Sequence, residues 1–276
     1  MAAIAVMSLA GAFGLLAARH DWGETLPKVP LVLARACVVT ADGQVNLSAQ
    51  QMANAATIAA VGIRQKMPEY AVIVALATAL QESKLENLAG GDRDSVGLFQ
   101  QRPSMDWGTP EEIRDPRYAS GKFYEALRKV EGWEDMRVTD AAQQVQRSAF
   151  PEAYQKWAPE SEVLTKALLG EATGAVSCTV SGEPEIRGAE AATGVEKGLN
   201  ADWGTLRSAT SDPAGLTVEV EDDRDGWRYA HWLVSHATQL GVRRVFFGGM
   251  VWDAEDGRWT RTAGGTGRVV AEVFNP

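Results

Sequence analysis

The most constraining feature of the sequence is an unbroken apolar run, Ala71–Leu80, in the middle of the stretch 70–103. The run is too long for an ordinary strand and contains neither Gly nor Pro, so it predicts a helix that is buried nearly all round. The run ends at Gln81-Glu82-Ser83, and a polar, Gly-rich loop follows over 90–95. A buried helix therefore delivers one carboxylate to the edge of whatever that helix supports.

The position of Glu82 suggests acid–base chemistry. A carboxylate anchored on an apolar helix loses hydration, and this loss favours its protonated form. A general acid that protonates a glycosidic oxygen needs that form near neutral pH. The alternative is that Glu82 lies in the last helical turn and merely faces water.

The residues around Glu82 carry a resemblance to a known family. Glu82-Ser83, the loop, then Ser95-Val96-Gly97-Leu98-Phe99-Gln100 and Pro103 resemble the motif pair of bacterial soluble lytic transglycosylases. These lysozyme-like enzymes cleave the glycan of peptidoglycan. In that family the helix-end Glu is the acid, and the Gly-Leu-(aromatic or Met)-Gln segment lines the sugar cleft. The resemblance implies that Glu82 is catalytic and that Ser83, Ser95 and Gln100 bind substrate.

The resemblance extends over residues 37–178, which look like a lysozyme-like module of secreted bacterial cell-wall proteins. It departs in a later segment that reads Ala-Tyr-Asn-Ala-Gly in transglycosylases, where the Tyr helps to hold the catalytic Glu. This chain has Arg147-Ser148-Ala149-Phe150 instead. The departure bears on catalysis rather than on the fold, and Tyr154 is expected to supply the missing hydroxyl as a substrate-site residue.

The resemblance also implies a mechanism with one carboxylate. Glu82 would protonate the bond after N-acetylmuramic acid and then take the proton of that sugar's own 6-hydroxyl, giving a 1,6-anhydro product. Asp94 is the nearby acid considered for a second role. Glu86 follows Glu82 at the four-residue spacing of one helix face, but we expect it to be a solvated residue of the last turn.

Capping signals place the surrounding helices. Ser48 with Gln51 forms a capping-box pattern before an Ala-rich helical stretch. Thr109 precedes Pro110 and Asp115 precedes Pro116, and each pair is typical of a helix start. Asp42-Gly43 allows a short hairpin ahead of the first helix.

Composition and charge limit the partners. The chain has 276 residues, 45% of them apolar, and a formal net charge of −9. A nucleic-acid partner is disfavoured because phosphate binding needs a basic face. Nine Trp residues are present; exposed Trp can stack on sugars, but core packing is expected for most of them.

The N-terminus and the two cysteines predict an extracytoplasmic protein. Residues 1–20 contain an apolar run of about one membrane thickness, which is expected to be a signal peptide or a single transmembrane anchor; a buried soluble helix is the alternative. Cys37 and Cys178 bracket the lysozyme-like region with no cysteine between them. Such an isolated pair suits a disulfide formed in an oxidising compartment, with two separate buried thiols as the alternative.

Residues 179–200 are rich in Gly, Ala, Glu, Ser and Thr and predict a flexible linker. Residues 201–276 predict a small α+β domain from an alternating strand over 216–221, a helix over 226–241, strands over 242–252 and 268–274, and a turn at Asp256-Gly257. The segment 211–220 resembles the Ser-Asp-His-Pro-x-Gly-x-Ala-x-Asp motif of zinc-binding peptidoglycan carboxypeptidase-like domains.

That second resemblance is degenerate at its metal ligands. Asp212 stands at the His position, Glu219 stands at the Asp position, and the terminal strand has no histidine. Because zinc needs imidazole or thiolate ligands within reach, and because His231 and His236 are spaced so that they do not share a helix face, we expect no metal and no cofactor. The domain is then one retained for binding or structure.

Taken together, these patterns predict an α+β fold with two domains. The predicted function is an exported or membrane-anchored protein that cleaves peptidoglycan glycan strands, with Glu82 as general acid and base. The alternative is a non-catalytic cell-wall binding or scaffold protein in which both domains have lost their chemistry. A transport role is disfavoured by the single hydrophobic segment. Other cell-wall proteins are possible partners of the C-terminal domain.

Overall fold

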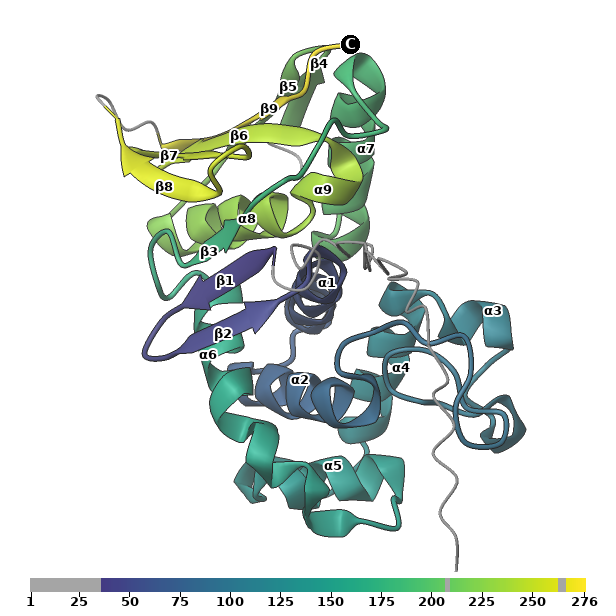
Figure 1. Ribbon diagram of the computed structural model, residues 1–276. Helices are drawn as coiled ribbons and strands as arrows, with labels where there is room; N and C mark the ends of the chain where they lie inside the picture. Colours follow the sequence, from purple (N-terminus) through teal and green to yellow (C-terminus); the bar gives the residue numbers. More distant parts are fainter. Residues whose placement is uncertain (1–35, 207–208, 263–266) are drawn as a thin grey trace, which may run out of the picture. The chain divides into compact units, whose positions relative to one another are not determined.

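The computed structural model describes residues 36–206, 209–262 and 267–276 (Figure 1). The hydrophobic N-terminal segment expected over 1–20 lies outside these residues. Within the described ranges, no helix combines the length and the hydropathy needed to cross a bilayer. The described residues form an α+β fold with two antiparallel sheets.

The first part of the chain is mostly helical. Its helices are α1 (Ala49–Arg64), α2 (Glu69–Ser83), α3 (Pro110–Ile113), α4 (Pro116–Leu127), α5 (Val138–Gln146) and α6 (Ala158–Leu168), with short 3₁₀ turns at η2 (Pro103–Met105), η3 (Trp133–Asp135), η4 (Pro151–Ala153) and η5 (Gln155–Trp157). The expected caps are confirmed: Ser48 and Gln51 form a capping box on α1, and Thr109 and Asp115 cap α3 and α4.

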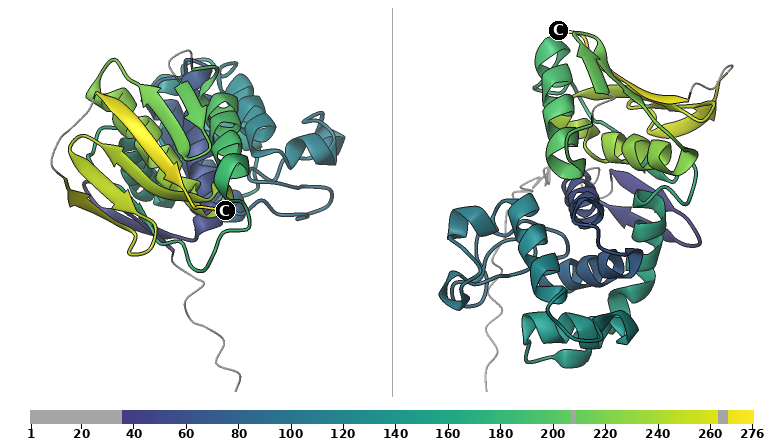
Figure 2. Two further views of the ribbon diagram at one scale, coloured as in Figure 1. Left: turned by 90° about the horizontal axis from the view of Figure 1, so that it is seen from above. Right: turned by 180° about the vertical axis from the view of Figure 1, so that it is seen from behind.

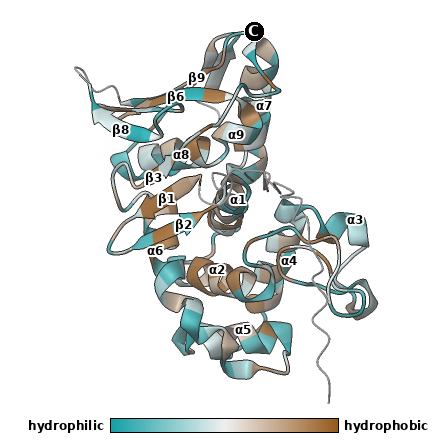
Figure 3. Cartoon of the chain, in the orientation of Figure 1, coloured by the Kyte–Doolittle hydropathy of each residue, from teal (hydrophilic) through white to brown (hydrophobic). Residues whose placement is uncertain are grey.

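Helix α2 is the apolar run predicted from the sequence, and its burial is confirmed. Its residues from Ala71 to Leu80 are buried except Ile73, which is half-buried. The helix contacts α1, α4, α5 and α6, and Figure 3 shows it as a largely hydrophobic element within the helical part. It ends at Ser83 because Lys84 and Leu85 adopt left-handed conformations. Glu86 therefore lies beyond the helix, and the expected last-turn position is wrong, although the residue is exposed as expected.

A three-stranded sheet of order β2-β1-β3 covers one side of the helices. Its strands are β1 (Cys37–Thr40), β2 (Gln44–Leu47) and β3 (Val176–Cys178). Strands β1 and β2 form the expected hairpin. Cys37 and Cys178 are directly opposite each other in the β1–β3 pair, and they form the predicted disulfide.

The second part contains a six-stranded antiparallel sheet of order β4-β5-β9-β6-β7-β8. Its strands are β4 (Ala209–Asp212), β5 (Gly215–Glu219), β6 (Val242–Phe247), β7 (Met250–Asp253), β8 (Arg258–Arg261) and β9 (Arg268–Val273). Helices α7 (Gly188–Trp203), α8 (Asp223–Ser235) and α9 (Ala237–Leu240) complete this part. Figures 1 and 2 show α8 lying across the face of the sheet that is turned toward α1.

Two expected elements differ from the structure. The flexible linker expected over 179–200 is helical from Gly188 onward, because Ala191, Val195 and Leu199 repeat every four residues and are buried. Gly198, one of the glycines that suggested flexibility, allows close packing, since a Cβ there would approach the Trp232 ring to 3.0 Å. The single strand expected over 242–252 is a hairpin, because Gly248 and Gly249 both adopt positive φ and turn the chain.

Helix α1 joins the two parts. It contacts α2 and α4 on one side and α7 and α8 on the other. Gly62 lets α4 approach closely, since a Cβ there would meet the Tyr124 hydroxyl at 2.7 Å. The described residues belong to one compact unit, and the proposed domain boundary near 179–200 stays a prediction.

Candidate active site

Glu82 stands in the last turn of α2, two residues before the left-handed Lys84 ends the helix. The preceding turns are buried among α1, α5 and α6, so the helix itself cannot shift without disturbing the core. The Glu82 side chain is half-buried. The buried helix thus holds one carboxylate at the edge of the core, where a ligand in solution can reach it.

Tyr154 supplies the partner of that carboxylate. Its hydroxyl donates a hydrogen bond to Glu82 Oε1 at 2.6 Å, across 72 positions of sequence. The tyrosine has no exposed surface and lies between η4 and η5. Burial, together with the hydrogen bond to the Glu82 carboxylate, raises the Tyr154 pKa. The phenol therefore keeps its proton and remains a donor. The hydroxyl expected at this position is present at the distance that a charge-assisted hydrogen bond requires.

Ser83 links α2 to the Gly-Leu-Phe-Gln segment. Its hydroxyl lies 2.7 Å from the carbonyl oxygen of Leu98 and 3.1 Å from that of Ala79, and its residue is 5% exposed. From the other side, Gln146 of α5 donates through Nε2 to the Phe99 carbonyl at 2.8 Å. The segment next to Glu82 is therefore fixed by α2 and α5 together, and Ser83 is a support rather than a surface contact.

Ser95 and Gln100 contact each other. The Ser95 hydroxyl lies 3.1 Å from Gln100 Oε1 and 2.8 Å from the Asp92 carbonyl, and Ser95 is 4% exposed. Gln100 is half-buried and donates through Nε2 to the Gly97 carbonyl. Of the four residues expected to bind substrate, Gln100 is the one with side-chain surface open to a ligand, whereas Ser83, Ser95 and Tyr154 lie beneath the surface.

Asp94 holds the loop after Gln100. Its carboxylate accepts from Arg102 Nε at 2.9 Å, and from the backbone and hydroxyl of Ser104 at 2.8 and 3.0 Å. These donors, the Ser104 backbone N–H first, hold the Asp94 pKa far below its usual value. A carboxylate that is so firmly ionised and fully engaged is a loop clamp, and it does not suit a role as a second proton donor.

A groove of about 800 Å³ opens beside Gln100. Its walls come from three segments. They are the loop over 100–107, the end of α4 and the turn after it over 126–131 together with Met136, and the end of α5 over 144–147. Gln100 and Gln146 line the groove. Gln100 belongs to the segment that Ser83 anchors, and Gln146 donates a hydrogen bond to that segment. Glu82 itself is not among the lining residues.

Left-handed backbone is concentrated around this region. Among the described non-glycine residues with positive φ, six lie within the candidate site and its loop: Lys84, Leu85, Arg93, Gln100, Asp106 and Arg147. Each such residue costs about 1 kcal/mol or more relative to ordinary backbone. Strained conformations of this kind persist where the surrounding structure imposes them, and they gather at functional sites.

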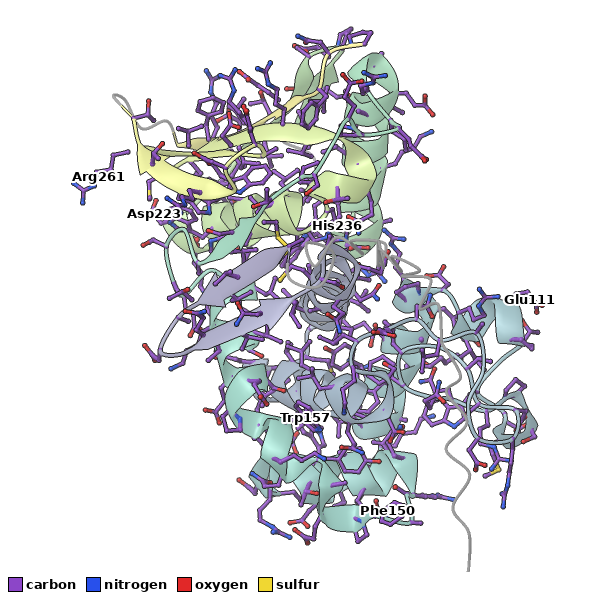
Figure 4. All side chains as sticks on the ribbon, in the orientation of Figure 1. Glu111, Phe150, Trp157, Asp223, His236 and Arg261 are labelled. Carbon is purple, nitrogen blue, oxygen red and sulfur yellow. A yellow bond between two sulfur atoms is a disulfide. The ribbon has the colours of Figure 1, made fainter. Side chains whose placement is uncertain are left out.

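Sequence reasoning missed several residues of the site. Trp157 donates through Nε1 to Gln81 Oε1 at 2.9 Å, and Lys84 Nζ lies 4.1 Å from the centre of its ring. Figure 4 shows Trp157 beside α2, and Phe150 on the loop after α5. Phe150 is 74% exposed, the most exposed large apolar side chain among the described residues. The residues Arg147-Ser148-Ala149-Phe150 carry no sequence signal that the Phe150 ring faces solvent.

The residues compared with zinc ligands in the sequence, Asp212 and Glu219, have structural partners. Asp212 accepts from the backbone N–H of Ala214 and Gly215 and shapes the β4–β5 turn, and Glu219 pairs with Arg268 at 3.9 Å. His231 is fully buried: its Nδ1 lies 2.7 Å from the Ala167 carbonyl, and its Nε2 accepts from the Ala175 N–H. Within the described ranges, no group of three His, Cys, Asp or Glu side chains is arranged to hold a metal ion.

Comparison with the sequence models of known protein families finds no match, and a search of characterised proteins finds no similar sequence. The interpretation of the site therefore depends on its geometry and on the motif resemblance.

Proposed function

We propose that this chain is an extracytoplasmic protein that cleaves the glycan strands of peptidoglycan, in the manner of a lytic transglycosylase. The observation that carries the proposal is the 2.6 Å hydrogen bond from Tyr154 to Glu82. A buried phenol fixes the one carboxylate that the motif resemblance marks as the acid, although the family's Ala-Tyr-Asn-Ala-Gly segment is replaced. The hydroxyl comes from a later position in the chain and serves the same carboxylate.

The geometry suits a reaction with a single carboxylate. Because Oε1 accepts the Tyr154 hydrogen bond, Oε2 is the oxygen on which Glu82 can carry the transferable proton. The acid gives this proton to the glycosidic oxygen while the C1–O4 bond breaks. The resulting carboxylate then removes the proton of the 6-hydroxyl as the C1–O6 bond forms, and the 1,6-anhydro end results. No second carboxylate is needed, in keeping with the clamped state of Asp94.

The disulfide supports the extracytoplasmic location. Cys37 and Cys178 close a loop with a sequence separation of 141, and such bonds form and persist in oxidising compartments. We propose that the N-terminal hydrophobic segment directs export, either as a cleaved signal or as a single anchor. The substrate would then be the peptidoglycan glycan strand, with other cell-wall proteins as possible partners of the second part.

A second candidate is a wall-binding protein without catalysis. It is favoured by one observation, namely that Glu82 is not among the residues lining the groove beside Gln100. In this case the groove holds a glycan strand, and the Tyr154–Glu82 pair is a packing feature inherited with the fold.

The two candidates separate in a digestion experiment. Purified cell-wall sacculi are incubated with the full chain and with Glu82→Gln, and the soluble products are analysed by liquid chromatography and mass spectrometry. The proposal expects 1,6-anhydro muropeptides from the unchanged chain and none from the variant. Glu86→Gln is the matched control, since Glu86 is exposed and loses the same charge. Sedimentation with the sacculi but no soluble product from any of the three chains would support the wall-binding alternative.

A further inference from the structure

The groove beside Gln100 differs in charge from the rest of the chain. Three cationic side chains line it, Arg102, Lys129 and Arg147, against one acidic side chain, Glu131. The whole chain, by contrast, carries a formal net charge of −9. A cationic groove on an acidic protein indicates selection for an anionic group of the ligand rather than a general surface property.

Two of the three cations are available to a ligand. Arg102 is engaged by Asp94 at 2.9 Å. Lys129 and Arg147 have no ion-pair partner among the described residues, and both are exposed. They come from different walls, Lys129 from the turn that follows α4 and Arg147 from the residue that caps α5. Arg147 also holds a left-handed conformation, with φ of 51°, where glycine would cost less.

One buried polar residue belongs to the groove lining. Gln101 is 2% exposed, and its Nε2 donates to the Ala119 carbonyl at 3.2 Å. This hydrogen bond fixes the wall of the groove to α4.

We propose that this groove binds the carboxylate-bearing part of the glycan strand, with Lys129 and Arg147 recognising a carboxylate. The identity of the ligand rests on the proposed function. Two sources of the carboxylate exist on such a strand, the lactyl group of a muramic acid without a peptide and the free carboxylates of an attached stem peptide. Both are anionic, which is the charge that Lys129 and Arg147 can neutralise.

The test measures binding without turnover. The full chain carrying Glu82→Gln is titrated by calorimetry with three probes: neutral chitohexaose, an amidase-treated strand with lactyl carboxylates, and a strand with intact stem peptides. Lys129→Gln with Arg147→Gln, added to Glu82→Gln, removes both groove cations. The matched control is Arg114→Gln with Lys197→Gln, which removes the same charge from two exposed residues outside the groove lining.

Removal of the groove cations is expected to weaken binding of a carboxylate-bearing strand by about 5- to 10-fold, the effect of two exposed ion pairs. The loss should shrink as salt is raised, and chitohexaose binding should not change. A loss confined to the stem-bearing strand assigns the carboxylate to the peptide, whereas a loss on the amidase-treated strand assigns it to the lactyl group.

The inference is overturned if the groove variant binds both anionic strands as tightly as the Arg114/Lys197 control does. That result leaves the proposed function standing, because cleavage by the unchanged chain and its loss in Glu82→Gln are measured separately. Absence of binding to all three probes, together with absence of cleavage, would overturn the proposed function along with the inference.

Discussion

The hydrogen bond between Tyr154 and Glu82 gives the most direct test of the site. Tyr154→Phe removes one hydroxyl from a fully buried ring and leaves the rest of the packing in place. The bond spans 2.6 Å, and a hydrogen bond to a charged group contributes about 1.5–3 kcal/mol. Because Glu82 is half-buried, water can replace the phenol at Oε1, so we expect the free energy of unfolding to fall by only about 1 kcal/mol.

The remainder of the effect should appear in catalysis. Without the phenol, the Glu82 side chain loses the contact that fixes its rotamer, and the acid no longer meets the glycosidic oxygen in one orientation. Loss of the remaining about 0.5–2 kcal/mol as positioning corresponds to an about 2- to 30-fold lower rate of muropeptide release. The assay is the release of 1,6-anhydro products from sacculi under conditions where both proteins are folded.

Tyr124→Phe is the matched control for this experiment. Tyr124 is also fully buried, and its hydroxyl donates to the Ile58 carbonyl at 3.0 Å, between α4 and α1. Its loss should cost a similar amount of stability, about 1 kcal/mol, without touching Glu82. If Tyr154→Phe releases products as fast as Tyr124→Phe does, the phenol does not position the acid, and the reasoning about the site is wrong.

Three further outcomes follow from the structure. Replacing Cys37 and Cys178 by Ala should lower the free energy of unfolding by about 4 kcal/mol, since the bond closes a long loop; urea unfolding measures this, and a change below about 1 kcal/mol contradicts it. Burial lowers the His231 pKa to about 4, so as pH falls below 6.5 the unfolded chain takes up a proton before the folded chain does. The free energy of unfolding should therefore drop by up to about 3 kcal/mol by pH 4. His231→Gln should make this dependence on pH shallower, and an unchanged slope would refute the assignment to His231. Asp202→Ala removes the acceptor of the buried Trp232 N–H and the partner of Arg117 and should cost about 1–3 kcal/mol. Thermal unfolding measures this as a lower melting temperature, and an unchanged melting temperature would contradict a stabilising role.

The elements that could be predicted are those whose signals lie within a few residues. The Ser48–Gln51 capping box, the Asp42-Gly43 hairpin and the apolar run of α2 each carry their own information. The disulfide was predictable because two cysteines leave one possible pair. In contrast, the sequence over α7 predicts a linker because its glycines lower helix propensity, and for Gly198 the reason, close packing against Trp232, is visible only in the folded chain.

The site was predicted in part for a similar reason. Glu82 stands out because the helix before it is apolar, and the hydroxyl expected from Tyr154 does contact it. Ser83 and Ser95 were assigned to substrate from their place in a motif, but the structure places them beneath the surface as supports. The groove could not be predicted, because its walls come from three separate segments that meet only in the folded chain.

The second part of the chain uses its ionisable residues to hold the first part together. Asp202 at the end of α7 has no exposed surface; it accepts from Thr57 of α1 at 2.8 Å and from Trp232 of α8 at 2.7 Å, and it pairs with Arg117 of α4. One buried carboxylate on α7 thus links three other helices, and the buried Trp232 N–H would be left without an acceptor if it were removed.

His231 makes a similar connection on another side, since one ring carries contacts to Ala167 at the end of α6 and to Ala175 just before β3. Helix α1, which α7 and α8 cover, is also the helix that supports α2. The position of Glu82 consequently depends on the second part through α1, even though no residue of that part contacts Glu82 through a hydrogen bond among the described residues. The second part therefore completes the core behind Glu82.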